Sequence, residues 1–139
     1  MFEEIYSVLL NTRIICTIDP IRIRQVISNL LVNAQKFTPS GGTVKIEIEL
    51  PSLINNKEVK INIKDTGSGI RKEDIPYIFE RFYKASDQTN RTYRGAGLGL
   101  AICKEIIDFH KGDIDVTSQV EQGSSFYFML PIKGEYESD

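Results

Sequence analysis

Apolar residues recur along this chain with two different periods, and each period predicts a different kind of element. Between residues 20 and 37 they recur at every third or fourth position, which is the spacing of an amphipathic helix. Asp19 supplies a capping side chain just before this segment, and Pro20 suits the first helical position. We therefore expect a helix that begins at Pro20 and ends at the run from Thr38 to Gly42, which contains a proline and two glycines.

Alternation of apolar and polar residues, which is typical of half-buried strands, follows in four segments. The first two, 44–50 and 59–63, are separated by a stretch whose Asn55 and Asn56 suit a hairpin turn, so we expect them to pair antiparallel. The other two, 114–116 and 126–130, lie near the C-terminus. A further short strand is predicted at 14–18, before the first helix.

The central part of the chain predicts two more helical regions and a loop. A short helical segment is predicted over 73–82, and an amphipathic helix from Leu98 to near Gly112, with Phe109 among its apolar residues. Between them, residues 86–94 have no apolar period, which predicts a mobile loop that acts as a lid beside a pocket. The order of elements indicates an α/β two-layer sandwich, a mixed and mostly antiparallel sheet packed by about three helices.

The composition indicates one domain and excludes several partners. A chain of 139 residues with 41% hydrophobic content has room for one core, which we place at about residues 14–131 of a single domain spanning 1–139. The net charge of -2 argues against nucleic acid as a partner. Cys16 and Cys103 fit no metal-site spacing, and no apolar run reaches membrane-spanning length. We expect a cytoplasmic domain with no membrane contact of its own, whether or not its parent protein is anchored to a membrane.

Three polar residues of the first predicted helix share one side of it. Asn29, Asn33 and Lys36 follow one another at steps of four and three residues, which places them in one stripe beside the apolar face. The amide oxygen of Asn33 suits a magnesium ion that takes its other ligands from water and phosphates, and Lys36 adds a cation nearby. Taken alone, the stripe is equally typical of an ordinary solvated helix edge.

Asp65 to Gly69 form a first glycine-rich turn at the end of a predicted strand. Gly67 and Gly69 allow the backbone to approach a flat ligand, and the carboxylate of Asp65 can accept a hydrogen bond from an exocyclic amine such as that of adenine. Ser124, which precedes the last strand, can hydrogen-bond near the same base. Either segment alone is also compatible with a simple turn.

A second glycine-rich turn, Gly95 to Gly99, opens the last predicted helix. Unpaired backbone N–H groups and the positive helix end would face an anion there, and phosphate is the natural guest, assisted by Arg91 or Arg94 of the loop. The alternative is a flexible hinge without a ligand. The sequence contains no G-x-x-x-x-G-K-[ST] motif and no later glycine to complete a dinucleotide fingerprint. The two turns and the polar helix stripe together predict a pocket for a purine triphosphate.

These segments, in this order, closely resemble the N, G1, F, G2 and G3 boxes of the ATP-binding catalytic domain of histidine kinases. The five boxes correspond to Asn29 to Phe37, Asp65 to Gly69, Ile78 to Phe82, Gly95 to Gly99 and Gly123 to Phe126. The family belongs to a superfamily shared with DNA gyrase, mismatch-repair ATPases and a heat-shock chaperone. The resemblance implies the α/β sandwich described above, with ATP held under a flexible lid.

The resemblance also implies roles for individual residues. Asn33 would bind Mg²⁺, Asn29 and Lys36 would act as catalytic residues near the phosphates, and Asp65 would bind the adenine amine. Phe79 and Phe82 would anchor the lid by packing in the core, whereas Lys84 stands where related kinases often carry an arginine. The nucleotide-binding residues implied in this way are Asn29, Asn33, Lys36, Phe37, Asp65, Gly67, Gly69, Ile70, Arg94, Gly95, Gly97, Leu98, Gly99 and Ser124.

One position separates the two chemistries of the superfamily. Hydrolysing members carry a glutamate four residues before the magnesium-binding asparagine, and this chain has Asn29 there, which cannot act as a base. The resemblance therefore implies a protein-histidine kinase domain that transfers the γ-phosphoryl group of ATP to a histidine on a separate dimerisation domain, with a response regulator as an indirect partner. The lone histidine, His110, is expected to be structural, so we expect no autophosphorylation by this chain.

Two other functions stay open at this point. One is an ATP-gated regulatory module, either a serine kinase of the anti-sigma type or a degenerate nucleotide sensor. The other is an ATPase clamp of the gyrase type, against which Asn29 argues. Transfer of label to a histidine, transfer to a serine, and turnover without an acceptor distinguish the three.

Overall fold

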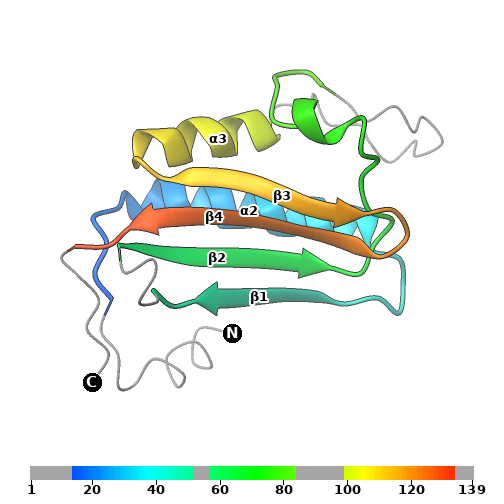
Figure 1. The fold of residues 1–139 in the computed structure, drawn as a ribbon, viewed down its shortest axis with the longest axis horizontal. Coiled ribbons are helices and arrows are strands. Elements are labelled where there is room, and N and C mark those ends of the chain that lie inside the picture. The colour runs from blue at the N-terminus through cyan, green and yellow to red at the C-terminus, as the bar shows by residue number, and fades with distance from the viewer. Residues whose placement is uncertain (1–13, 52–56, 84–98, 134–139) are drawn as a thin grey trace.

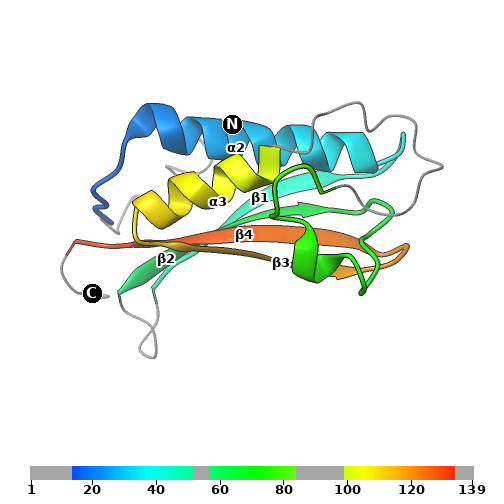
Figure 2. The ribbon, with the colours of Figure 1, turned by 90° about the horizontal axis from the view of Figure 1, so that it is seen from above.

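The described part of the chain folds into two layers, a four-stranded sheet with two α-helices packed on one of its faces (Figures 1 and 2). This computed structural model describes residues 14–51, 57–83 and 99–133. Its elements are α2 (Pro20–Phe37), β1 (Val44–Glu49), β2 (Glu58–Asp65), a 3-10 helix (Ile75–Tyr77), α3 (Gly99–Phe109), β3 (Asp113–Gln119) and β4 (Gly123–Pro131). The predicted two-layer α/β sandwich is confirmed.

The sheet is antiparallel rather than mixed. Its strand order is β1-β2-β4-β3, and each of the three pairings between the described strands is antiparallel. The predicted antiparallel pairing of the first two strands is confirmed, because Val44 of β1 lies opposite Asp65 of β2, whereas the turn predicted at Asn55 and Asn56 lies outside the described residues. Within residues 14–51, 57–83 and 99–133 the helical layer consists of two α-helices, since the third predicted helical segment forms only a single 3-10 turn.

Helix α2 begins and ends where the sequence predicts. The carboxylate of Asp19 accepts hydrogen bonds from the backbone N–H groups of Ile21 and Arg22 at 3.1 and 3.2 Å, which satisfies two amides that have no partner within the helix. At the other end, the hydroxyl of Thr38 donates to the carbonyl oxygen of Ala34 at 2.7 Å. Side chains next to both ends of α2 therefore bond to backbone groups of its first and last turns.

The core lies between the helices and the inner face of the sheet. Leu30 of α2, Ile63 of β2 and the two β4 phenylalanines, Phe126 and Phe128, are among its largest fully buried side chains. Alternation along β4 points Ser125, Tyr127 and Met129 to the other face, which the two helices leave uncovered (Figure 2). No helix among the described residues is long and apolar enough to cross a membrane.

The strand predicted at 14–18 is wrong. These residues form no strand, and a backbone hydrogen bond from Lys133 N–H to the carbonyl oxygen of Ile15, at 2.6 Å, joins them to the segment after β4. Strand pairing between residues 14–18 and the end of β4 would also need a backbone N–H donor at Pro131, and proline has none. The apolar run therefore packs partly against the core without joining the sheet.

Phe82, predicted for the core, and Phe109, predicted for the apolar side of the last helix, are both exposed. Phe109 is 80% exposed: it is the last residue of α3 and lies two positions after the fully buried Ile107, a rotation of about 200° around the helix. Phe82 is 69% exposed, and its φ of 63° shows that the chain leaves helical geometry there, so a helical spacing from Phe79 does not apply. Phe79 does pack on the core, with its ring edge-on to that of Phe126 at 6.3 Å.

Thiol reactivity provides a test of this packing. Cys103 is fully buried and its Sγ lies 3.9 Å from the carbonyl oxygen of Val26, and burial raises the pKa of its thiol to about 11. At pH 8 about one such thiol in a thousand is ionised, so iodoacetamide should spare Cys103 in the native protein. Cys16 is half-buried, which raises its pKa as well, yet it should react first.

Peptide mass spectrometry over time measures both rates. In denaturant the two cysteines should react at the same rate, which serves as the control. Equal rates in the native protein would contradict the buried position of Cys103.

Candidate nucleotide-binding site

Asp65 ends β2 as a buried carboxylate with one oxygen held by backbone amides. It is 8% exposed, and its Oδ1 accepts hydrogen bonds from Gly67 N–H at 2.9 Å and Ser124 N–H at 3.3 Å. Burial raises the pKa of this carboxyl, and the two amide hydrogen bonds oppose that rise. Among the described residues, Oδ2 accepts no hydrogen bond. The site thus presents one fixed oxygen and one available acceptor.

The first glycine turn fits closely between two neighbouring segments. A Cβ on Gly67 would lie 2.3 Å from the carbonyl oxygen of Phe37, which also accepts a hydrogen bond from Ser68 N–H at 3.2 Å. Gly69 has a φ of +72°, and a Cβ there would lie 2.2 Å from the carbonyl oxygen of Gln119. Contacts within the protein therefore require glycine at both positions, whether or not a ligand also approaches the turn.

The polar stripe of α2 connects this turn to the start of α3. The amide nitrogen of Asn29 lies 3.5 Å from the carbonyl oxygen of Gly99, the first residue of α3, while Phe37 at the end of α2 contacts Gly67. Asn33 lies one turn from each and is half-buried, and Lys36 is exposed. Among the described residues, the stripe of Asn29, Asn33 and Lys36 therefore lies on the part of α2 that runs from its contact with Gly99 toward the turn after Asp65.

The remaining predicted residues are divided between the described part of the chain and the rest. Ile70 is half-buried against the core, and Ser124 is buried next to Asp65. Gly99 is exposed and begins α3. Outside the described residues lie the other predicted members of the second glycine turn and the lid, which are Arg94, Gly95, Gly97 and Leu98, together with Lys84 and the loop 86–94.

The donor atoms present suit magnesium bound through a nucleotide. The described residues contain no group of three or more His, Cys, Asp or Glu side chains that could hold a metal ion. A single neutral amide oxygen, that of Asn33, fits an ion whose other ligands are waters and phosphates. We therefore keep Asn33 as the candidate magnesium ligand.

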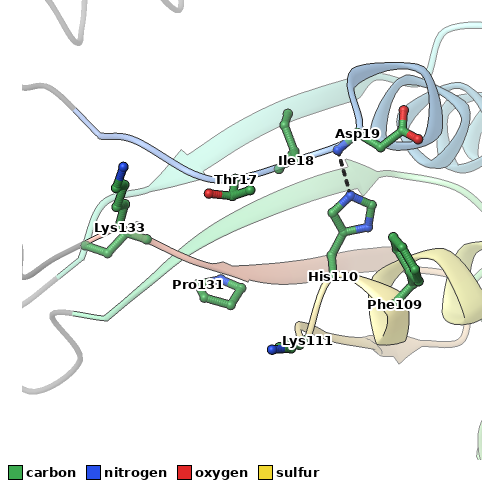
Figure 3. Close-up of a pocket in the computed structure, with 9 residues that line it drawn as sticks. Thr17, Ile18, Asp19, Phe109, His110, Lys111, Pro131 and Lys133 are labelled. Atoms are coloured by element: carbon green, nitrogen blue, oxygen red, sulfur yellow. Dashed lines mark hydrogen bonds between the residues drawn. The ribbon is translucent and has the colours of Figure 1, made fainter.

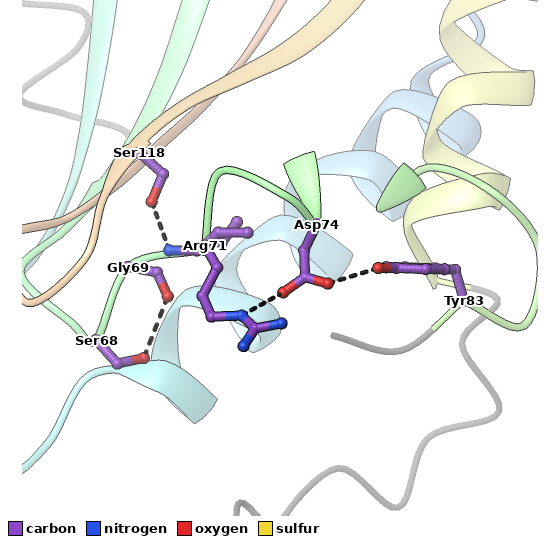
Figure 4. A network of polar contacts seen from close by, with 7 residues as sticks. Ser68, Gly69, Arg71, Asp74, Tyr83 and Ser118 are labelled. Atoms are coloured by element: carbon purple, nitrogen blue, oxygen red, sulfur yellow. Dashed lines mark hydrogen bonds and ion pairs between the residues drawn. The ribbon is translucent and has the colours of Figure 1, made fainter. Parts of the chain in front are cut away.

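Two residues of this region were not predicted from the sequence. Ser118, near the end of β3, accepts a hydrogen bond from Ile70 N–H at 2.7 Å. Asp74, whose side chain is only 3% exposed, pairs with Arg71 Nε at 3.2 Å and accepts from the Tyr83 hydroxyl at 2.5 Å (Figure 4). The Arg71 and Asp74 spacing of three residues was the one available signal, whereas Ser118 looks like any polar residue of an alternating strand.

A groove of about 520 Å³ lies at the opposite end of both helices, and no predicted site residue lines it. His110 stands in this groove (Figure 3). Its Nε2 accepts a hydrogen bond from Asp19 N–H at 2.9 Å, and its Nδ1 lies 2.7 Å from the carbonyl oxygen of Ile106. His110 thus joins the end of α3 to the start of α2, which confirms its predicted structural role.

Comparison with known proteins agrees with this geometry. Residues 18–134 match the family described as "Histidine kinase-, DNA gyrase B-, and HSP90-like ATPase". The chain is 41% identical over 124 residues to sensor histidine kinase WalK of Bacillus subtilis, covering 88% of this chain and 20% of that protein. It is 41% identical over 114 residues to the adaptive-response sensory kinase SasA of Synechococcus elongatus, covering 82% of this chain and 28% of SasA.

Solved structures show the same relationship. The mycobacterial sensor histidine kinase MprB matches with a TM-score of 0.76 and 25% identity, over 95% of this chain and 91% of that one. The catalytic domain of histidine kinase ThkA matches with a TM-score of 0.67 and 33% identity, over 82% and 69% of the two chains. The chain thus spans less than a third of WalK or SasA but most of these solved domains. It belongs to the histidine kinase-, DNA gyrase B- and HSP90-like ATPase family, as a catalytic domain of the sensor histidine kinase type.

Proposed function

We propose that this chain binds Mg·ATP and positions its γ-phosphoryl group for transfer to a histidine on a separate dimerisation domain. The observation that carries the proposal is the contact of Asn29 with Gly99, which joins the polar stripe of α2 to the start of α3. The start of a helix favours phosphate because its first N–H groups and its positive dipole end face outward. The phosphates would therefore lie between Lys36, Asn29 and α3.

Adenine would lie against the first glycine turn. Asp65 Oδ2 is the acceptor available for the exocyclic amine, and Gly67 and Ser124 hold the other carboxylate oxygen. An available acceptor on a carboxylate that is only 8% exposed distinguishes adenine from a base that presents a carbonyl oxygen at the same position, because two acceptors facing each other repel. The supporting evidence is the orientation of the carboxylate and its burial.

The side chains of this region position the substrate and do not activate water. Asn29 is a neutral amide with no basic group, so it can orient a phosphate but cannot take a proton. Magnesium held through Asn33 would neutralise charge on the β- and γ-phosphates when it is bound. Transfer then depends on a nucleophile supplied by the acceptor domain, which would in turn pass the phosphoryl group to a response regulator.

Transfer of label to an added acceptor tests this function. The domain is mixed with a separately expressed dimerisation domain of a histidine kinase and γ-labelled ATP. We expect acid-labile label on the acceptor histidine, because phosphohistidine hydrolyses in acid, and none on this chain. The acceptor with its histidine replaced by alanine is the control.

Each other outcome points to a different function. Acid-stable label on a protein substrate would indicate a serine kinase, and rapid ADP release without an acceptor would indicate an ATPase. Label on His110 would contradict both the proposal and the structural role of that residue.

A further inference from the structure

Ser118 uses its whole hydrogen-bonding capacity on two segments that surround Asp65. Its Oγ accepts from Ile70 N–H at 2.7 Å and lies 2.8 Å from Ser124 Oγ and 3.1 Å from the carbonyl oxygen of Gly123. A hydroxyl has one proton to donate and two lone pairs that accept. These three protein contacts therefore occupy it, and Ser118 acts on neighbouring residues rather than on a ligand.

The two segments that Ser118 joins are the ones that fix the Asp65 carboxylate. Ile70 ends the turn that begins at Asp65, and Figure 4 shows the Ser118 hydroxyl directed at the backbone nitrogen just before Arg71. Ser124 donates its backbone N–H to Asp65 Oδ1. One hydroxyl thus links the turn after the carboxylate with the strand that holds one of the carboxylate's oxygens.

Backbone packing around this link is close. Glu121 N–H donates to the carbonyl oxygen of Ser68 at 2.8 Å, so the turn between β3 and β4 is bonded to the first glycine turn. Gly123 has a φ of +110°, and a Cβ there would lie 2.0 Å from the carbonyl oxygen of Asp65. Because the backbone at Gly123 contacts the backbone at Asp65, a small displacement at Ser118 has to move the Asp65 carboxylate or its hydrogen-bond partners.

We propose that Ser118 is a positioning residue for adenine recognition: it holds the two turns in the register that directs Asp65 Oδ2 at the exocyclic amine. The inference rests on the proposed role of Asp65 in binding that amine. Removing the hydroxyl leaves Ile70 N–H and Ser124 without a shared partner, so the carboxylate loses its fixed direction while the phosphate region, on α2 and α3, is unchanged.

The test compares ATP with purine riboside 5′-triphosphate, which lacks only the amine, by calorimetric titration. The wild-type protein should prefer ATP by about tenfold, the value of one hydrogen bond to a charged group. In Ser118→Ala the Kd for ATP should rise about fivefold while that for the analogue changes less than about twofold. Thr117→Ala removes a hydroxyl from the exposed side of the same strand and should keep the wild-type preference.

Each result has one meaning. A Ser118→Ala variant that weakens both ligands equally, or neither, would overturn the positioning role, because a purely structural residue does not change the ratio. A wild-type protein with no preference for ATP would instead overturn the proposed role of Asp65. If Ser118→Ala does not fold, Ser118→Cys keeps the shape with a weaker hydrogen-bonding atom, and a wild-type ratio in that variant would overturn the inference.

Discussion

Asp65→Asn should strongly weaken ATP binding and, at the same time, stabilise the nucleotide-free domain. Burial raises the pKa of this carboxyl above its ordinary value of 3.8, so the folded state disfavours the charge that Asp65 carries at neutral pH. An amide oxygen can still accept from Gly67 and Ser124 without that penalty. The same amide can turn an NH₂ group toward the amine, where the carboxylate presented an acceptor. We expect the Kd for ATP to rise about 10- to 100-fold.

The pH dependence of stability follows from the direction of the shift. Because the folded state holds the Asp65 proton more tightly than the unfolded chain, wild-type stability falls as pH rises from about 3.8 through the raised pKa. The stability advantage of Asp65→Asn should therefore grow across that range and stay constant above it. ATP binding by the wild-type protein should weaken as pH falls through the same range, because a protonated carboxyl is a poorer acceptor.

Scanning calorimetry at several pH values and titration with ATP measure the two effects. Asp115→Asn is a matched control, because Asp115 is exposed on β3 and its Oδ1 also accepts a backbone N–H, that of Val116, at 2.8 Å. The control should change neither quantity appreciably. An Asp65→Asn variant that is less stable at pH 7 and binds ATP as the wild type does would contradict both expectations.

The elements that local chemistry defines could be predicted from the sequence. Asp19 and Pro20 specify the start of α2, and the alternation of 44–50 with 59–63 specifies an antiparallel pair, because each signal acts within a few residues. The positions of Phe82 and Phe109 were predicted wrongly because their burial depends on more than local signals. A local apolar period does not show where helical geometry stops, and it does not show whether the last apolar residue of a helix reaches the core.

In the candidate site, too, local features could be predicted from the sequence and contacts between distant residues could not. Asp65 could be found as a turn residue after a strand, but Ser118 is 48 residues from its partner Ile70, and nothing near it in the chain marks that contact. Gly67 and Gly69 were predicted for a ligand's approach, whereas their closest neighbours are carbonyl groups of Phe37 and Gln119. Interactions set by the packing of distant turns become visible only in the folded structure.

Asn33→Ala should remove the magnesium dependence of ATP binding while leaving the fold intact. Asn33 is half-buried on α2 and forms no part of the buried core, and alanine is the best helix former, so the helix should tolerate the change. The amide oxygen it removes is the proposed protein ligand to the ion. Since even indirect partners of a metal site are worth about 10- to 100-fold in affinity, we expect a loss of at least about tenfold for Mg·ATP.

The comparison that isolates the metal role is titration with ATP in magnesium and in EDTA. Wild-type protein should bind more tightly with magnesium, and Asn33→Ala should bind equally weakly in both, because Asp65 and Lys36 still act on the nucleotide. Gln35→Ala changes an exposed residue of the same helix and should behave as the wild type. Wild-type affinity of Asn33→Ala for Mg·ATP would exclude Asn33 as the ligand and would require the ion to be held through the phosphates and other residues.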